Sequence, residues 1–116
     1  MEQPDREKIE SIIKTRKKAH AFYSKKSKVY KCFLDLEKHT YMDGKLGKLQ
    51  KELIAIGISV AINCESCMEW HIKQALDVGG SEEEILEAIE VGIEMGGGQA
   101  TVSARFAMNV LEYYHK

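Results

Sequence analysis

The segment from Leu46 to Ile62 constrains the fold of this 116-residue chain more than any other. Its apolar residues would point in nearly every direction around a helix, and its β-branched side chains would also suit a buried strand. We predict a helix, because the segment is long for a strand and the sequence offers no second strand to pair with it. A chain of this length has little core with which to surround such a helix. We therefore expect an all-α protein that buries this helix partly against neighbouring subunits of a homo-oligomer.

Apolar spacing and turn signals predict five further helices. They run from Asp5 to about Tyr23, from Val29 to about Lys38, from Cys64 to Val78, from Ser81 to Met95 and from Gln99 to Tyr114. Asp43-Gly44 predicts a turn, and Ser81 with Glu84 has the spacing of a helix capping box. We expect the three glycines at 96–98 to form a loop between the last two helices.

Charge is distributed unevenly along the chain. Ten Lys and Arg residues lie between positions 6 and 31, whereas positions 63–94 hold nine acidic residues and only Lys73 as a base. These two segments could pair within one chain or between chains, or each could be an ordinary solvated helix face. The single proline and the lack of a linker favour one compact unit. We predict a basic helical arm at 1–28 and a helical domain at 29–116.

Composition excludes several classes of protein. Seventeen Lys and Arg against eighteen Asp and Glu give a net charge of −1, without the basic excess of a nucleic-acid binder. The first ten residues do not resemble a secretory signal, and the longest apolar run, Leu53 to Ile62, is about half the length of a membrane span. We expect a cytoplasmic protein with no nucleic-acid or membrane partner. Three cysteines in a reducing compartment indicate catalysis or metal binding more than a structural framework.

Cys64, Cys67 and His71 form a C-x-x-C-x-x-x-H motif at the predicted start of a helix. Residues three, four and seven apart share one helical face, so the three side chains would lie in one stripe. A helix N-terminus and a nearby imidazolium both favour the reactive thiolate. A peroxide would convert that thiolate to a sulfenic acid, which the second thiol would capture as a disulfide. The spacing leaves open which thiol attacks, because Cys64 lies nearer the helix start and Cys67 lies one turn before His71.

Three other interpretations compete with the redox dithiol. The motif could bind zinc through its two thiolates and its imidazole, with Glu52, Glu69 or water as the fourth ligand, although structural zinc sites usually take four Cys or His ligands. A packed pair without function is disfavoured by the charged and imidazole side chains beside it. A thioredoxin fold does not fit, because its C-x-x-C follows a strand in an α/β pattern that is absent here.

The stretch from Glu52 to His71 reads E-x11-C-x2-C-x3-H, which resembles the signature of alkylhydroperoxidase D-like proteins in the carboxymuconolactone decarboxylase superfamily. The resemblance extends from about Val29 to Tyr114 and leaves only the basic arm outside. It implies an all-α fold, a homo-oligomer, often a trimer or hexamer, and a redox-active dithiol that reduces hydroperoxides. An external thiol or dithiol protein would supply the electrons, and we expect no bound cofactor or metal.

By the same resemblance, Cys67 is the peroxidatic cysteine, Cys64 the resolving cysteine, His71 the proton-relay base and Glu52 the carboxylate that orients or charges His71. The residues themselves also favour this pairing, because a buried glutamate in an apolar helix needs a partner such as His71. The alternative is that Glu52 lies on a solvated first turn. Ser66 departs from the pattern, because the peroxidase that names the group has a histidine between its cysteines. Slow peroxide turnover, and a role as a disulfide reductase or redox sensor, therefore stay open.

Lactone decarboxylation is a minor alternative, because the decarboxylases that this fold resembles generally lack the cysteine pair. Cys32 has no motif around it, and we expect a buried structural thiol. We expect the remaining histidines, His20, His39 and His115, to be surface residues outside the site.

Overall fold

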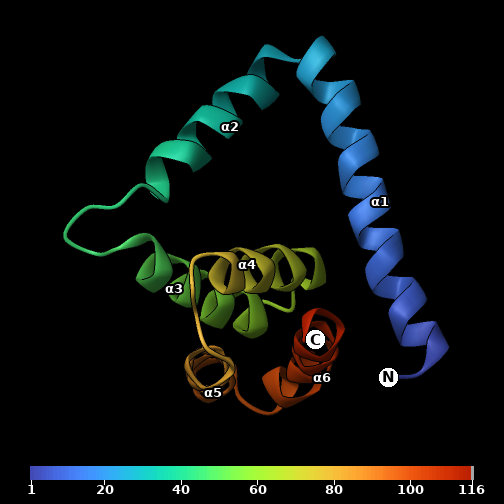
Figure 1. The fold of residues 1–116 in the computed structure, drawn as a ribbon, viewed down its shortest axis with the longest axis vertical. Helices are drawn as coiled ribbons and strands as arrows, with labels where there is room; N and C mark the ends of the chain where they lie inside the picture. The colour runs from blue at the N-terminus through green and yellow to red at the C-terminus, as the bar shows by residue number, and fades with distance from the viewer. Residues whose placement is uncertain (116) are drawn as a thin grey trace.

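A computed structural model describes residues 1–115, which fold into six helices without any strand (Figure 1). The helices are α1 (Gln3–Lys26), α2 (Lys28–Thr40), α3 (Lys48–Ala61), α4 (Glu65–Asp77), α5 (Glu82–Gly96) and α6 (Gly98–Tyr114). The all-α prediction is therefore confirmed. None of the helices within residues 1–115 is long and apolar enough to cross a membrane.

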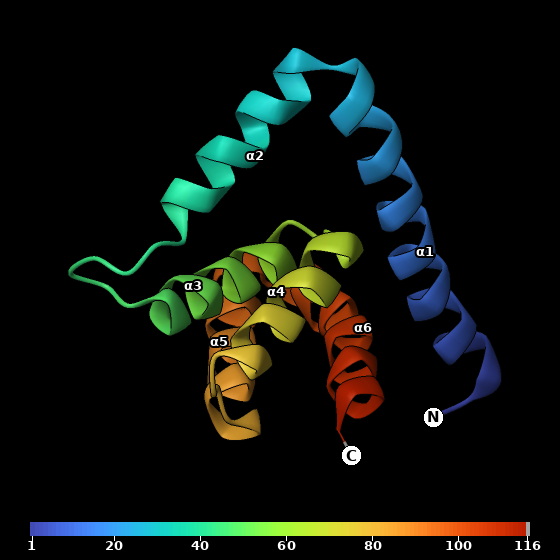
Figure 2. The ribbon, with the colours of Figure 1, turned by 45° about the horizontal axis from the view of Figure 1, so that its top comes forward.

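Helices α3 to α6 form the body of the molecule (Figures 1 and 2). Helix α3 packs against α4, α5 and α6, and buries Ile56 and Val60 completely. Its contact with α5 is close, because a Cβ atom on Gly92 would overlap the carbonyl oxygen of Gly57. The opposite side of α3 leaves Ile54 and Ile58 at least half exposed, and Ile62, the C-cap residue that follows the helix, is exposed too. A single chain therefore buries only one side of this apolar helix.

Helices α1 and α2 form an arm that projects from the body as an inverted V (Figures 1 and 2). The first half of α1 lies along α6, where Ile9 is fully buried and the Tyr113 hydroxyl donates to Glu10 at 3.2 Å. Ser27 ends α1 and caps α2, since its hydroxyl oxygen accepts the amide N–H of Tyr30 at 3.0 Å. Helix α2 itself has no fully buried residue. The arm is therefore attached mainly through α1.

Several helix ends differ by a few residues from the predicted ones, and two of these differences have a clear local cause. The predicted glycine loop is a single residue, Gly97, whose φ of 75° favours glycine and turns the chain directly from α5 into α6. Helix α3 begins at Lys48, two residues after the predicted start, because the Asp43 carboxylate accepts the Lys48 amide N–H at 2.7 Å. The predicted capping box at Ser81 and Glu84 is present, with hydrogen bonds of 2.9 and 3.1 Å.

The prediction that Cys32 is buried is wrong, because this thiol is exposed on α2. Helix α2 packs toward α1 through the side that carries Tyr30, and the Cys32 side lies away from that contact. His20, His39 and His115 are exposed, as predicted. None of the four lies among the residues that gather around the Cys64–Cys67 pair.

Candidate redox site on α3 and α4

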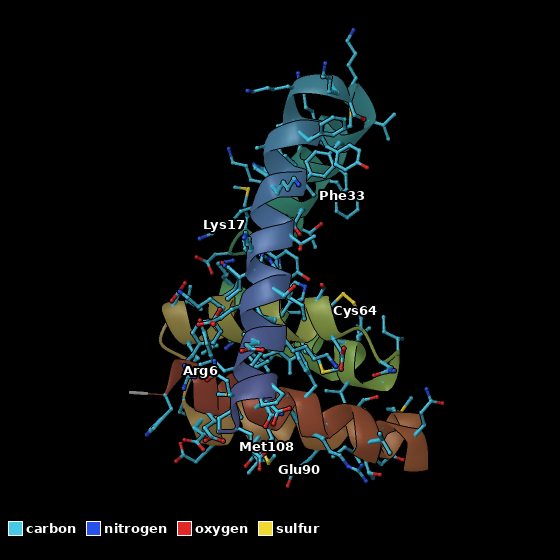
Figure 3. The ribbon with its side chains drawn as sticks, turned by 90° about the vertical axis from the view of Figure 1, so that its right-hand side faces the viewer. Arg6, Lys17, Phe33, Cys64, Glu90 and Met108 are labelled. Carbon is cyan, nitrogen blue, oxygen red and sulfur yellow. A yellow bond between two sulfur atoms is a disulfide. The ribbon has the colours of Figure 1, made fainter. Side chains whose placement is uncertain are left out.

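Cys64 and Cys67 are joined by a disulfide at the start of α4, with their Cα atoms 5.2 Å apart. Cys64 is the N-cap of the helix, and its Sγ accepts the amide N–H of Cys67 at 3.3 Å. The chain reverses between α3 and α4 through Asn63, whose φ of 57° is in the left-handed region. Ser103 on α6 donates to Asn63 Oδ1 at 2.9 Å and holds this turn. Figure 3 shows Cys64 on the body, to one side of α1.

His71 lies one helical turn after Cys67 and contacts Glu52 on α3. Its Nδ1 lies 2.7 Å from Glu52 Oε1, while the Lys48 ammonium donates to Glu52 Oε2 at 2.8 Å. The Glu52 carboxylate is 1% exposed. Burial alone would raise its pKa, but the hydrogen bonds and charges of His71 and Lys48 outweigh burial and lower the pKa. An ionised carboxylate accepts hydrogen bonds only, so Nδ1 is the donor and Nε2 is left to exchange a proton.

Tyr41, at the end of α2, packs against this pair. Its ring centroid lies 5.3 Å from that of His71, and the Lys48 ammonium lies 5.5 Å from the Tyr41 ring. Burial, followed by the charges of Glu52 and Glu37, raises the pKa of Tyr41, so the phenol stays protonated at neutral pH. A cavity of about 560 Å³ opens beside these residues and is lined by α2, α3 and α4. Its lining residues are Leu34, Glu37, Lys38, Tyr41, Met42, Asp43, Lys48, Glu52, Trp70 and Gln74.

Sequence reasoning missed two members of this cluster. Lys48 precedes Glu52 by four residues, a spacing that places the two side chains on one helical face and could have revealed the pair. The burial of Glu52 also rules out the alternative of a glutamate on a solvated first turn. Tyr41 carried no comparable signal, since it reaches His71 from a different helix and 30 positions away along the chain.

Glu69 is a second buried acid, and its partners come from α1 and α6. Its carboxylate pairs with the Arg16 guanidinium from α1 and accepts the hydroxyl of Tyr114 from α6. The Arg16 guanidinium also lies 4.9 Å from the Trp70 ring centroid. Burial, then the hydrogen bond to Glu69 and its charge, raises the pKa of Tyr114 strongly. These contacts occupy both Glu69 oxygens, so this residue is not a fourth ligand for the motif.

Metal binding was the principal alternative for the motif. Across the described part of the chain, no group of three or more His, Cys, Asp or Glu side chains is arranged to hold a metal ion. The two sulfurs are bonded to each other, and the His71 Nδ1 is engaged by Glu52. Six helices around a C-x-x-C disulfide and a buried Glu-His pair define an all-α protein with a paired-cysteine site.

Comparison with known proteins identifies the family. The model of the carboxymuconolactone decarboxylase family matches residues 27–109, and the chain belongs to that family. It is 41% identical over 80 residues to the uncharacterised protein 4 in the cox locus of Paracoccus denitrificans, which covers 69% of this chain and 72% of that protein. It is 35% identical over 82 residues to an uncharacterised protein of Cupriavidus necator, covering 71% and 70% of the two chains.

Two solved structures share most of this fold. A carboxymuconolactone decarboxylase family protein from Legionella pneumophila superposes with a TM-score of 0.87 at 30% identity, covering 94% of this chain and 98% of that chain. A family member from Thermotoga maritima superposes with a TM-score of 0.80 at 28% identity, covering 88% and 87%. Involvement of the Thermotoga protein in an antioxidative response has been suggested.

Proposed function

We propose that this protein is a thiol-dependent hydroperoxide reductase in which Cys67 attacks the peroxide and Cys64 resolves the product. The observation that carries the proposal is the Cys64–Cys67 pair at the start of α4, one turn before a histidine bound to a buried carboxylate. The positive end of the helix favours a thiolate at its first turn. The suggested antioxidative role of the Thermotoga family member is in line with this chemistry.

The proposed catalytic cycle uses Cys67, Cys64 and His71. The reduced Cys67 thiolate attacks one peroxide oxygen, the O–O bond breaks, and Cys67 becomes a sulfenic acid. The alkoxide that leaves takes a proton from His71 and departs as an alcohol. The Cys64 thiol then attacks the Cys67 sulfur, which forms the disulfide and releases water. An external dithiol returns both cysteines to the reduced state by thiol–disulfide exchange.

Glu52 acts through His71 in this scheme. Its negative charge orients the ring through Nδ1 and stabilises the imidazolium that donates the proton from Nε2. Lys48 holds the second carboxylate oxygen and keeps the acid ionised. The cavity lined by Tyr41, Lys48 and Glu52 offers room next to the Glu52 carboxylate for part of an organic hydroperoxide.

A redox sensor or general disulfide reductase would use the same two cysteines. Ser66 favours this second candidate, because the peroxidase that names the group has a histidine between its cysteines and this chain has none. A sensor would form the disulfide once with peroxide and turn over slowly, whereas a peroxidase would cycle as long as a dithiol is supplied.

Mass spectrometry of the reduced, metal-free chain tests the proposal. A stoichiometric dose of organic hydroperoxide should remove two hydrogens, and peptide mapping should place the new disulfide at Cys64 and Cys67. The Cys64→Ser variant should instead gain one oxygen at Cys67, and the Cys67→Ser variant should gain none. Cys32→Ser is the matched control and should behave as the unmodified chain, because Cys32 lies on α2 outside the site.

The rate of peroxide reduction with a small dithiol as reductant separates a peroxidase, which cycles, from a redox sensor, which turns over slowly. Cys67→Ser should lower peroxide reduction by about a thousand-fold or more, as expected when a nucleophile is removed. Full activity in Cys67→Ser would overturn the assignment of this residue. A different result would be thiols that stay reduced after peroxide treatment, in a protein that binds zinc tightly as purified. This result would overturn the peroxidase proposal in favour of a metal-binding module.

A further inference from the structure

A second cavity lies beneath the arm, next to the one that Glu52 lines. This arm cavity has a volume of about 580 Å³ and is lined by α1, α2 and α4. The two arm helices meet near their junction, where the rings of Tyr23 and Tyr30 stack with their centroids 5.5 Å apart. From there they diverge toward the body (Figures 1 and 2). A hollow of this volume is large enough to hold a small organic molecule.

The sides of the arm cavity formed by α2 and α4 are apolar. Phe33 and Leu34 line it from α2, and the Trp70 ring lines it from α4. Figure 3 shows Phe33 on the arm, above the body, and this side chain is 58% exposed. An apolar chain or ring in the cavity would remove this surface from water, which favours binding.

The α1 side of the arm cavity carries positive charge. Arg16, Lys17 and His20 line it, and none of them lines the cavity beside Glu52. The Arg16 guanidinium is already paired with Glu69. The Lys17 ammonium, by contrast, is exposed and has no ion-pair partner among residues 1–115. Lys17 is therefore available to bind an anionic group of a ligand, such as a carboxylate.

The arm cavity adjoins the cavity beside Glu52. Three residues line both hollows, namely Leu34, Glu37 and Trp70. Trp70 follows Cys67 by three residues, so the two side chains are neighbours on the surface of α4. A ligand that extends from the arm cavity past Trp70 therefore enters the hollow beside the Glu52 carboxylate.

Charge makes the two ends of this joint hollow unequal. The end beside Glu52 is lined by three acids and two lysines, and one of the lysines, Lys48, is bound to Glu52 itself. Glu37, on the boundary, is the acid that lines the arm cavity, and Lys17 lies on α1 across from it. A ligand carboxylate is therefore favoured at the Lys17 end, which leaves the uncharged end of the ligand toward Glu52.

We propose that the arm cavity binds the organic part of the hydroperoxide, and that this part is an apolar chain or ring that ends in a carboxylate. The carboxylate pairs with Lys17, the apolar part packs on Phe33 and Trp70, and the hydroperoxide end extends toward Glu52. The link to a hydroperoxide rests on the proposed function, whereas the binding of an apolar carboxylate does not. Lys17 determines specificity in this arrangement and takes no part in breaking the O–O bond.

The fluorescence of Trp70, the single tryptophan of the chain, tests binding without any redox chemistry. Decanoate is the anionic probe and decanol is the neutral probe of equal chain length. Decanoate should change the emission saturably, and Lys17→Met should weaken its binding about fivefold relative to that of decanol. Lys18→Met is the matched control, because Lys18 is exposed and lies outside the cavity lining, and it should leave the ratio of the two dissociation constants unchanged.

A change on the apolar side tests the same site independently of charge. Phe33→Ser should weaken the binding of both probes, whereas Leu36→Ser should not, because Leu36 is 60% exposed on the same helix but does not line the cavity. Circular dichroism would establish that each variant is folded. The proposal would be overturned by an emission that decanoate does not change, by a ratio unaffected by Lys17→Met, or by equal effects of Phe33→Ser and Leu36→Ser.

A pair of hydroperoxides connects the site to the reaction. Decanoate that carries a hydroperoxide at its far end and the methyl ester of this compound differ in negative charge. The ratio of their kcat/KM values, acid to ester, should fall about fivefold in Lys17→Met, mainly through KM, and stay unchanged in Lys18→Met. An unchanged ratio in Lys17→Met would overturn the substrate assignment. Saturable decanoate binding without turnover of either hydroperoxide would overturn the proposed function and still support the binding site.

Discussion

Glu52 and Glu69 are both fully buried carboxylates, yet they belong to regions with different tasks. Glu52 lies within the body, and its two carboxylate oxygens bind Lys48 and His71. Glu69 lies where α1, α4 and α6 meet and is bound by Arg16 and Tyr114. Two glutamates with similar burial therefore belong to two different clusters. One cluster includes His71 of the cysteine motif, and the other joins the arm to the body.

The partners of each acid decide what its cluster can do. Imidazole is the side chain that gains and loses a proton near neutral pH, so the Glu52 cluster can move a proton. A guanidinium stays charged, and the raised pKa of Tyr114 keeps its phenol protonated, so neither partner of Glu69 supplies a proton near neutral pH. The second cluster instead fastens the arm to the body.

Removing the Glu69 carboxylate should have the largest effect, and it should fall on stability. Glu69→Leu leaves the partly buried Arg16 without its partner, and we expect a loss of about 2–4 kcal/mol in the free energy of unfolding, measured by urea denaturation. Arg16→Met combined with Glu69→Leu should recover most of this loss, because the pair is then replaced by apolar groups. A double variant no more stable than Glu69→Leu would show that the ion pair is not the source of the loss.

Neutralising Glu52 should instead affect the reaction. We expect Glu52→Gln to lower kcat/KM for an organic hydroperoxide by about 100-fold, because His71 loses the charge that supports its imidazolium. The matched change Glu69→Gln should leave the rate within about threefold in conditions where the variant is folded. Equal losses of rate in the two variants would contradict the division of tasks between the two acids.

Acid should weaken the Glu52 cluster. The pKa of Glu52 in the folded chain is below its ordinary value of 4.5, so its ionisation contributes stability above that value, and the contribution is lost as the pH falls through the folded pKa. Between about pH 5 and pH 3, the unmodified chain should therefore lose stability more steeply than Glu52→Gln. Urea midpoints at successive pH values measure both slopes. Equal slopes for the two proteins would show that Glu52 does not cause the loss of stability in acid.

Lys48 should have the smallest effect of the four. Lys48→Met removes one of the two hydrogen bonds to Glu52 while leaving the His71 bond intact, so we expect kcat/KM to fall by about threefold. Lys51→Met is the matched control, because the Lys51 ammonium donates to the Met42 carbonyl at 2.7 Å and not to Glu52. A loss of rate in both variants would indicate a general effect of charge on the body.

Much of the fold could be predicted because its signals are local. The helices, the Ser81 capping box and the Cys64–Cys67 pair all depend on residues within one helical turn of each other. The Gly97 turn was harder to predict, since three successive glycines do not reveal which one adopts a positive φ. Cys32 was misplaced for a related reason, because its burial depends on which side of α2 meets the rest of the chain.

The all-α class, the cysteine pair at a helix start and the requirement of an acid in α3 for a partner follow from the sequence alone. Which distant groups meet the two buried acids depends instead on how the helices pack: Arg16 reaches Glu69 across 53 positions, and His71 reaches Glu52 across 19. Helical periodicity sets the neighbours within a turn. Neighbours on other helices depend on how all the apolar faces pack together, which no single segment specifies.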